Sequence, residues 1–130
     1  MPEPVGFYIV KLRVERKGLV GAPVLTLDLG VYAPLGEING SGEITQSLPP
    51  PYGQIHIPQI TGHIHHTGFG HDEQLVSLHG QYVVSLPPPA IGSYLANFTA
   101  ALVVDAGWNG KGTFTYNHHT VTNADVTKIG

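Results

Sequence analysis

The feature that most constrains this chain is a two-residue alternation of apolar and polar side chains. In Val24–Ala33, the apolar residues Leu25, Leu27, Leu29 and Val31 occupy every second position. A period of two is that of a β-strand with one buried face and one solvent-facing face. With the glycine- and proline-rich turns between such segments, the sequence predicts strands at Phe7–Arg16, Val24–Ala33, Ile38–Leu48, Gln54–His66, Gln74–Leu86, Ser93–Asp105, Gly112–His118 and Thr120–Ile129.

A closed barrel is the predicted architecture of these strands. Gly40 and Gly42 fall on the inner face of their strand, where glycine is typical of a bend or a close backbone approach. Pro58 removes a hydrogen-bond donor and indicates an edge or a bulge. A helix is the alternative for Ser93–Asp105, which is rich in alanine. Because closure removes exposed edges, we predict an all-β, antiparallel up-and-down barrel of about eight strands rather than a two-sheet sandwich or jelly roll.

Composition narrows the class of protein further. A length of 130 residues predicts a single domain spanning residues 1–130. Charged residues make up 12%, about half the usual share, and this argues against long solvated helices. The chain has no cysteine, which excludes disulfides, thiolate metal sites and cysteine nucleophiles. Four of its six Lys and Arg residues lie within Lys11–Lys17, too narrow a patch for a nucleic-acid groove.

The sequence also bears on location. No apolar run approaches the ~20 residues that a helix needs to cross a bilayer, so no membrane span is predicted. The first ten residues, MPEPVGFYIV, lack the basic and long apolar regions of a signal peptide. A cytoplasmic protein is therefore the default prediction, unless a leader was cut away or export is leaderless.

The first half of the chain resembles a known group of proteins. The segments GAPVLTLDLGVYAP and GSGEITQSLPPP, within Gly21–Pro51, are similar in glycine and proline spacing to a small bacterial family of all-β proteins of unassigned function. The resemblance implies a bacterial origin and an all-β domain. It implies no catalytic residues.

The segment Gln59–Glu73 has the highest concentration of candidate functional residues and holds four of the eight histidines. His63 and His65 share one face of the predicted strand, and two imidazoles at that spacing chelate a transition metal. His71 and Glu73 are candidate further ligands, with Asp72 and His79 as alternatives. The sequence therefore predicts a divalent metal site at His63, His65, His71 and Glu73, where a bound water would be activated.

Two other interpretations of this histidine cluster stay open. The histidines can be solvated residues on a polar strand face, or they can sense pH, because clustered imidazoles shift one another's titration. A cupin-like metal-dependent enzyme is a further alternative, because cupins combine an HxH motif with a following Glu and a distant His. The match is partial: seven residues separate His65 from Glu73, and His118 lacks the Pro-x-Gly that precedes the distant histidine of cupins.

A second candidate site is a ligand-binding rim. Trp108 and Asn109 lie in a predicted hairpin turn, where they would stack on and hydrogen-bond a sugar; the alternative is that they cap the barrel mouth. The strand order places this turn at the same end as the histidine-rich turn, so His66 joins the rim. Tyr94, beside a proline-rich loop, is a candidate for a recognition surface. Trp108, Asn109 and the neighbouring rim underlie a carbohydrate-binding, lectin-like alternative.

No catalytic residues are assigned. The serines do not sit in a G-x-S-x-G elbow, and no pair of carboxylates is spaced as in a glycosidase. Few charges on a β protein favour a surface that meets another surface. We therefore predict a non-enzymatic binding or self-assembling module that forms a homo-oligomer, with a glycan, a small molecule inside the barrel or a divalent metal as the other candidate ligands.

Overall fold

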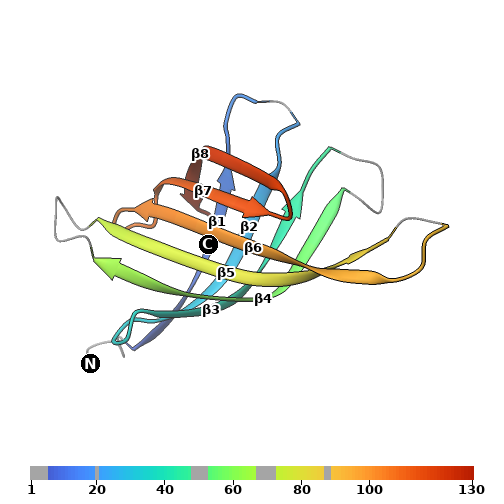
Figure 1. Ribbon diagram of the computed structural model, residues 1–130. Coiled ribbons are helices and arrows are strands. Elements are labelled where there is room, and N and C mark those ends of the chain that lie inside the picture. Colours follow the sequence, from blue (N-terminus) through green and yellow to red (C-terminus); the bar gives the residue numbers. More distant parts are fainter. Residues whose placement is uncertain (1–5, 20, 48–52, 67–72, 87–88) are drawn as a thin grey trace.

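The computed structural model describes residues 6–19, 21–47, 53–66, 73–86 and 89–130. Eight antiparallel strands close into a barrel in the order of the sequence (Figure 1). This confirms the predicted all-β, up-and-down barrel. The strands are β1 (Phe7–Glu15), β2 (Val24–Tyr32), β3 (Glu37–Thr45), β4 (Gln54–His66), β5 (Gln74–Ser85), β6 (Ser93–Val104), β7 (Gly110–Tyr116) and β8 (His119–Lys128).

The described residues contain no helix, so the helical alternative for Ser93–Asp105 is wrong. Its β-branched residues and its alternation of apolar side chains suit a pleated strand, and β6 buries every second residue from Ala96 to Val104. Accordingly, the described part of the chain holds no helix long and apolar enough to cross a membrane.

The inward-facing residues fill the barrel. They form one apolar cluster to which every strand contributes, and no polar or charged residue of the described chain is buried. The largest fully buried side chains are Tyr116, Phe98 and Phe114. The interior is therefore a packed core, which argues against the prediction of a small molecule carried inside the barrel.

Glycine and proline shape the wall as predicted. A Cβ on Gly40 would overlap the carbonyl oxygen of Asp28, so this position requires glycine because the strands approach too closely for any side chain. The β3–β4 register shifts between Gly40 and Gly42, where β4 carries one extra residue at Pro58–Gln59. The bulge expected from Pro58 is thus present in β4.

Two strands extend beyond their neighbours. The β4–β5 pairing ends at Gln59 and Gln81, although β5 continues to Ser85. The β6–β7 pairing begins at Phe98, although β6 begins at Ser93. Residues 82–86 and 89–97, called the arm below, therefore form a two-stranded extension that projects from the barrel (Figure 1). Tyr82 and Ala96, at its base, are still buried in the core.

The barrel closes where its first and last strands meet. Leu12 to Glu15 of β1 pair with Lys128 to Asp125 of β8. Beyond this register, the Lys11 amide donates to the Gly130 carbonyl at 3.1 Å, and the Ile129 amide donates to the Lys11 carbonyl at 2.8 Å. Every other strand pairing joins strands that are consecutive in the sequence.

Candidate functional site

Charge is distributed unevenly around the barrel wall. The strands β4, β5 and β6 contain no Asp, Glu, Lys or Arg, and the sequence from Gln74 to Val104 has none at all. The charged strands form exposed ion pairs: Lys11–Asp28 at 3.8 Å, Arg13–Glu15 at 3.6 Å and Lys111–Asp125 at 2.6 Å. Three neighbouring strands thus present a face whose only ionisable side chains are histidines and tyrosines.

The arm exposes large apolar side chains. Val83 and Leu95 are direct cross-strand partners, and each is more than 60% exposed, at 64% and 62%. Ile91 at the tip is 97% exposed, and Leu86 is exposed beside it. Exposed apolar residues scattered singly are ordinary, whereas a contiguous group on two paired strands is a candidate interaction surface.

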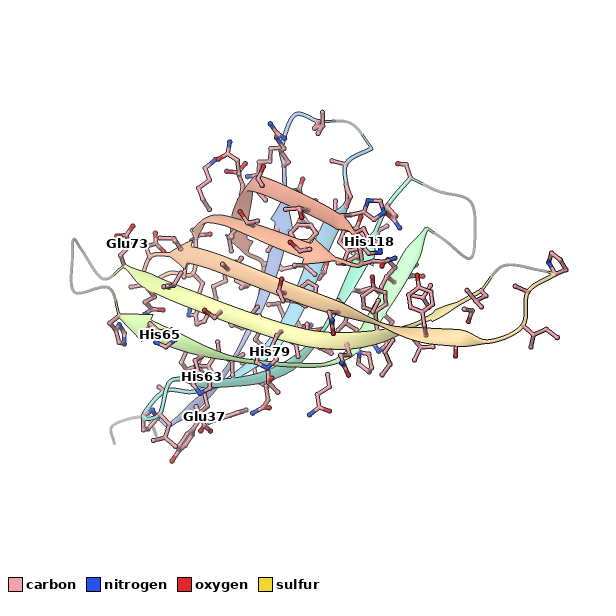
Figure 2. All side chains as sticks on the ribbon, in the orientation of Figure 1. Glu37, His63, His65, Glu73, His79 and His118 are labelled. Atoms are coloured by element: carbon pink, nitrogen blue, oxygen red, sulfur yellow. The ribbon has the colours of Figure 1, made fainter. Side chains whose placement is uncertain are left out.

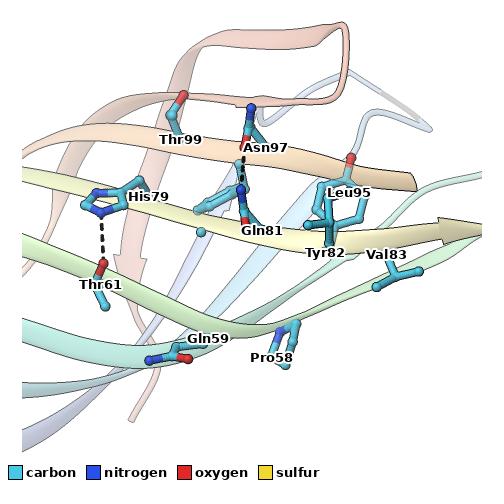
Figure 3. Close-up of a pocket in the computed structure, with 12 residues that line it drawn as sticks. Pro58, Gln59, Thr61, His79, Gln81, Tyr82, Val83, Leu95, Asn97 and Thr99 are labelled. Carbon is cyan, nitrogen blue, oxygen red and sulfur yellow. Dashed lines mark hydrogen bonds between the residues drawn. The ribbon is translucent and has the colours of Figure 1, made fainter. Parts of the chain in front are cut away.

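A groove lies on the outer side of the wall where β4 and β5 separate. Its volume is about 610 Å³, and it reaches from the outward side chains of β4, β5 and β6 to the inner residues Tyr82 and Phe98 (Figure 3). Thr61 Oγ1 and His79 Nε2 share a hydrogen bond of 3.0 Å, and Gln81 Nε2 donates to Asn97 Oδ1 at 3.3 Å. The groove therefore offers uncharged hydrogen-bonding groups beside the apolar surface of Val83 and Leu95.

Tyrosines gather at this end of the barrel. Tyr82 is only 3% exposed, and burial, with smaller effects from Tyr94 and Tyr116, raises its pKa to about 12. Burial also raises the pKa of Tyr116, whose hydroxyl donates to Gln46 Oε1 at 2.9 Å. Both phenols stay neutral in ordinary conditions, so these two tyrosines add no charge to the neighbouring arm and groove.

The predicted metal ligands are only partly brought together. His63 and His65 are exposed on the outer face of β4, with ring centroids 6.3 Å apart (Figure 2). His71 lies outside the described residues. Among those described, no group of three His, Cys, Asp or Glu side chains is arranged to hold a metal ion, and Glu73 does not complete one with the histidine pair.

Glu37 is a residue near this pair that the sequence did not reveal. It lies directly opposite His63 in the β3–β4 register (Figure 2). The predicted strand began at Ile38, one residue after Glu37, and strand alternation alone does not give the register between two strands. A correct β3–β4 pairing would have been the signal needed to find it.

The predicted ligand-binding residues do not form one site. Tyr94 lies in the arm, at the opposite end of β6 from Trp108 and Asn109, while His66 is exposed at the Trp108 end. The four residues therefore cannot contact one sugar. The distribution follows from the length of β6, which separates its first residues from the turn that follows it.

Trp108 covers the barrel mouth. It is 4% exposed, and its indole nitrogen donates to the Tyr8 hydroxyl at 3.3 Å, with the two rings in an edge-to-face arrangement. Asn109 is also engaged: its Oδ1 accepts the Lys128 amide at 3.1 Å, and its Nδ2 donates to the Gly107 carbonyl at 3.2 Å. This geometry favours the capping interpretation, because the buried indole presents no face for stacking.

Comparison with known proteins identifies the family of this chain. The model of the family described as "Domain of unknown function (DUF1842)" matches residues 5–121, which span β1 to β7 and the first residues of β8. Among curated proteins, none matches the chain.

Proposed function

The chain belongs to the DUF1842 family, and for this member we propose a non-enzymatic, self-assembling module in which two copies pair through the arm. The observation that carries the proposal is the arm itself: two strands that extend beyond their neighbours, expose apolar side chains and contain no charge. An isolated two-stranded hairpin is marginally stable in water, so a partner would stabilise it.

Protection against pairing is missing from the arm. Native edge strands are usually guarded by charged residues, above all lysine, which prevent association with another edge. The arm strands carry serine, valine, leucine, tyrosine, alanine and asparagine in their place. Prolines stand only in the loop that joins them, at Pro87–Pro89.

The favoured partner is a second copy of the chain. A two-fold dimer brings the same patch of each subunit together, so each patch must be compatible with itself. The uncharged arm meets this condition, whereas the net charge of −3 makes the remaining surfaces of two copies repel. Pairing through the arm thus joins the neutral faces.

Sedimentation velocity over a range of concentrations tests the proposal. Wild-type protein should pass from monomer to dimer, and Leu95→Lys should weaken association by about a hundredfold, because a twofold interface loses ~1.5 kcal/mol from each copy. Val103→Lys is the matched control: Val103 is also apolar and exposed on β6, but it lies in the closed barrel. A wild-type protein that stays monomeric, or equal association by both variants, would contradict the proposal.

The other predicted roles have fewer described groups to support them. Metal binding or pH sensing would rest on His63 and His65, with Glu37 opposite, and carbohydrate binding would no longer rest on the buried Trp108. A cupin-like activity would need a third ligand. These roles, the bacterial origin and the cytoplasmic location stay predictions.

A further inference from the structure

The separation of β4 from β5 creates an opening in the barrel wall beside the base of the arm, with Val83 and Leu95 of the arm among its lining residues. From Gln59 onward β4 pairs with β5, but its earlier residues pair with β3 alone. In the same way, β5 beyond Gln81 pairs with β6 alone. Pro58 stands at the point of separation and has no amide hydrogen to donate, so the opening is built into the sequence.

Each strand beside this opening has one edge without a partner among the described strands. Along such an edge, alternate residues direct their amide and carbonyl groups outward. We propose that the groove binds an extended, uncharged peptide segment of a partner protein, which adds as a strand to an edge at the opening. Strand addition of this kind takes affinity from main-chain hydrogen bonds and specificity from pockets for alternate side chains.

The lining of the groove sets the chemistry of the segment. Gln59, Gln81 and Asn97 supply amides that both donate and accept, and Thr61 and His79 add further polar groups. The strands that form the groove carry no fixed charge. A charged side chain of the peptide would therefore lose its hydration without gaining an opposite charge. Serine, threonine or asparagine would regain hydrogen bonds in the groove, and an aliphatic residue has no charge to desolvate.

A peptide fits this site better than a sugar. Sugars are commonly held by stacking on an exposed aromatic face, but the aromatic residues that border the groove, Tyr82 and Phe98, are buried. Unpaired strand edges are a specific match for a peptide backbone. The volume of about 610 Å³ is within the ~300–1,000 Å³ typical of ligand sites, enough for a short segment.

Affinity selection from a library of capped peptides tests the proposal. The peptides, about six residues long to match a typical strand, contain only Ser, Thr, Asn, Gln, Val and Leu. Wild-type protein should enrich particular sequences, and Gln59→Arg should bind them about tenfold more weakly, because the longer charged side chain occupies the groove. Thr120→Arg, on exposed β8, is the matched control and should bind as wild type does.

The mode of binding is tested with the enriched peptides themselves. Methylating alternate backbone nitrogens should weaken binding by about tenfold or more, because it removes main-chain donors without adding charge. In ¹⁵N NMR spectra, the peptides should shift the amide signals of residues 54–57 and 81–85. No enrichment, equal binding by the methylated peptides, or shifts elsewhere would overturn the proposal, as would maltohexaose shifting these signals when the peptides do not.

Because Val83 and Leu95 belong to both the groove and the arm, the peptides are tested at protein concentrations low enough for the monomer, where peptide binding is separable from self-association. Sedimentation of the same samples reports the oligomeric state, and Gln59→Arg should leave it as in wild type because Gln59 lies on β4, outside the arm. If the protein self-associates but binds no peptide, only the groove proposal is contradicted. If a strictly monomeric protein binds the peptides, only the proposal of pairing through the arm is contradicted.

Discussion

The two sides of this barrel have the same inner face and different outer faces. On β1, β2, β7 and β8, charged residues pair across the outer surface, and the strands stay within the closed wall. On β4, β5 and β6, the outer surface carries no fixed charge, the wall opens at Gln59 and Gln81, and two strands project. Because both sides bury alternating apolar residues alike, the fold depends on the inner face, and the two sides differ in their outer surfaces.

The largest expected effect separates the core from the arm. Phe114→Ala should lower the free energy of unfolding by about 3–5 kcal/mol, because it leaves a cavity at a residue with no exposure. Leu95→Ala in the arm should change it by less than about 0.5 kcal/mol when the protein is dilute enough to be monomeric. Urea unfolding followed by circular dichroism measures both. Similar losses from the two variants would mean that the arm belongs to the core.

A smaller effect concerns Tyr82, at the border between barrel and arm. Its pKa in the folded protein, about 12, exceeds the ordinary value of 10, so the stability it contributes is complete below pH 10 and is lost as the pH rises toward about 12. Tyr82→Phe should remove part of this loss of stability at alkaline pH. Tyr116→Phe should remove a further part, because burial also raises the pKa of Tyr116. Unfolding midpoints across this pH range give the measurement.

Tyr32→Phe is the control for that experiment. Tyr32 is exposed on β2, and its replacement should leave the alkaline loss unchanged. An alkaline loss that persists in full when both Tyr82 and Tyr116 are replaced by phenylalanine would show that burial of the phenols is not its cause.

The smallest effect is expected on the charged side. The hydrogen bond from Lys111, followed by smaller electrostatic effects, lowers the pKa of Asp125, so Lys111→Ala should let that pKa rise toward its ordinary value. Stability should change little, since an exposed ion pair is screened by water and salt. Carboxyl titration by NMR at low and high salt measures the shift. Lys11→Ala, which removes the longer Lys11–Asp28 pair, should leave Asp125 unaffected.

Much of the fold was predictable because it follows from local patterns. The alternation at Leu25–Val31 gives an inner face that the structure buries, and the turns joining consecutive strands give the order of the barrel. Gly40 and Pro58 also acted as expected, one at a close approach and the other at a bulge. Each of these features is determined by the residue itself or by its immediate neighbours.

The candidate sites were less predictable because they depend on register and strand length. Glu37 meets His63 only through the β3–β4 register, whereas the distance between Tyr94 and Trp108 already followed from the predicted strand Ser93–Asp105. To predict the arm, one must know that the β4–β5 pairing ends at Gln81 and that the β6–β7 pairing begins only at Phe98, although β5 and β6 extend further. The unbroken run without charge from Gln74 to Val104 was visible, but its meaning depended on which strands it would cover.

The junction between β1 and β8 has a consequence for how the molecule is made. Each hairpin can form as soon as its two strands have left the ribosome, but this junction joins residues more than a hundred positions apart, from Leu12 to Lys128. Contacts so distant in sequence carry the largest loop-closure entropy and slow folding. During synthesis the barrel therefore cannot close until its last strand has left the ribosome.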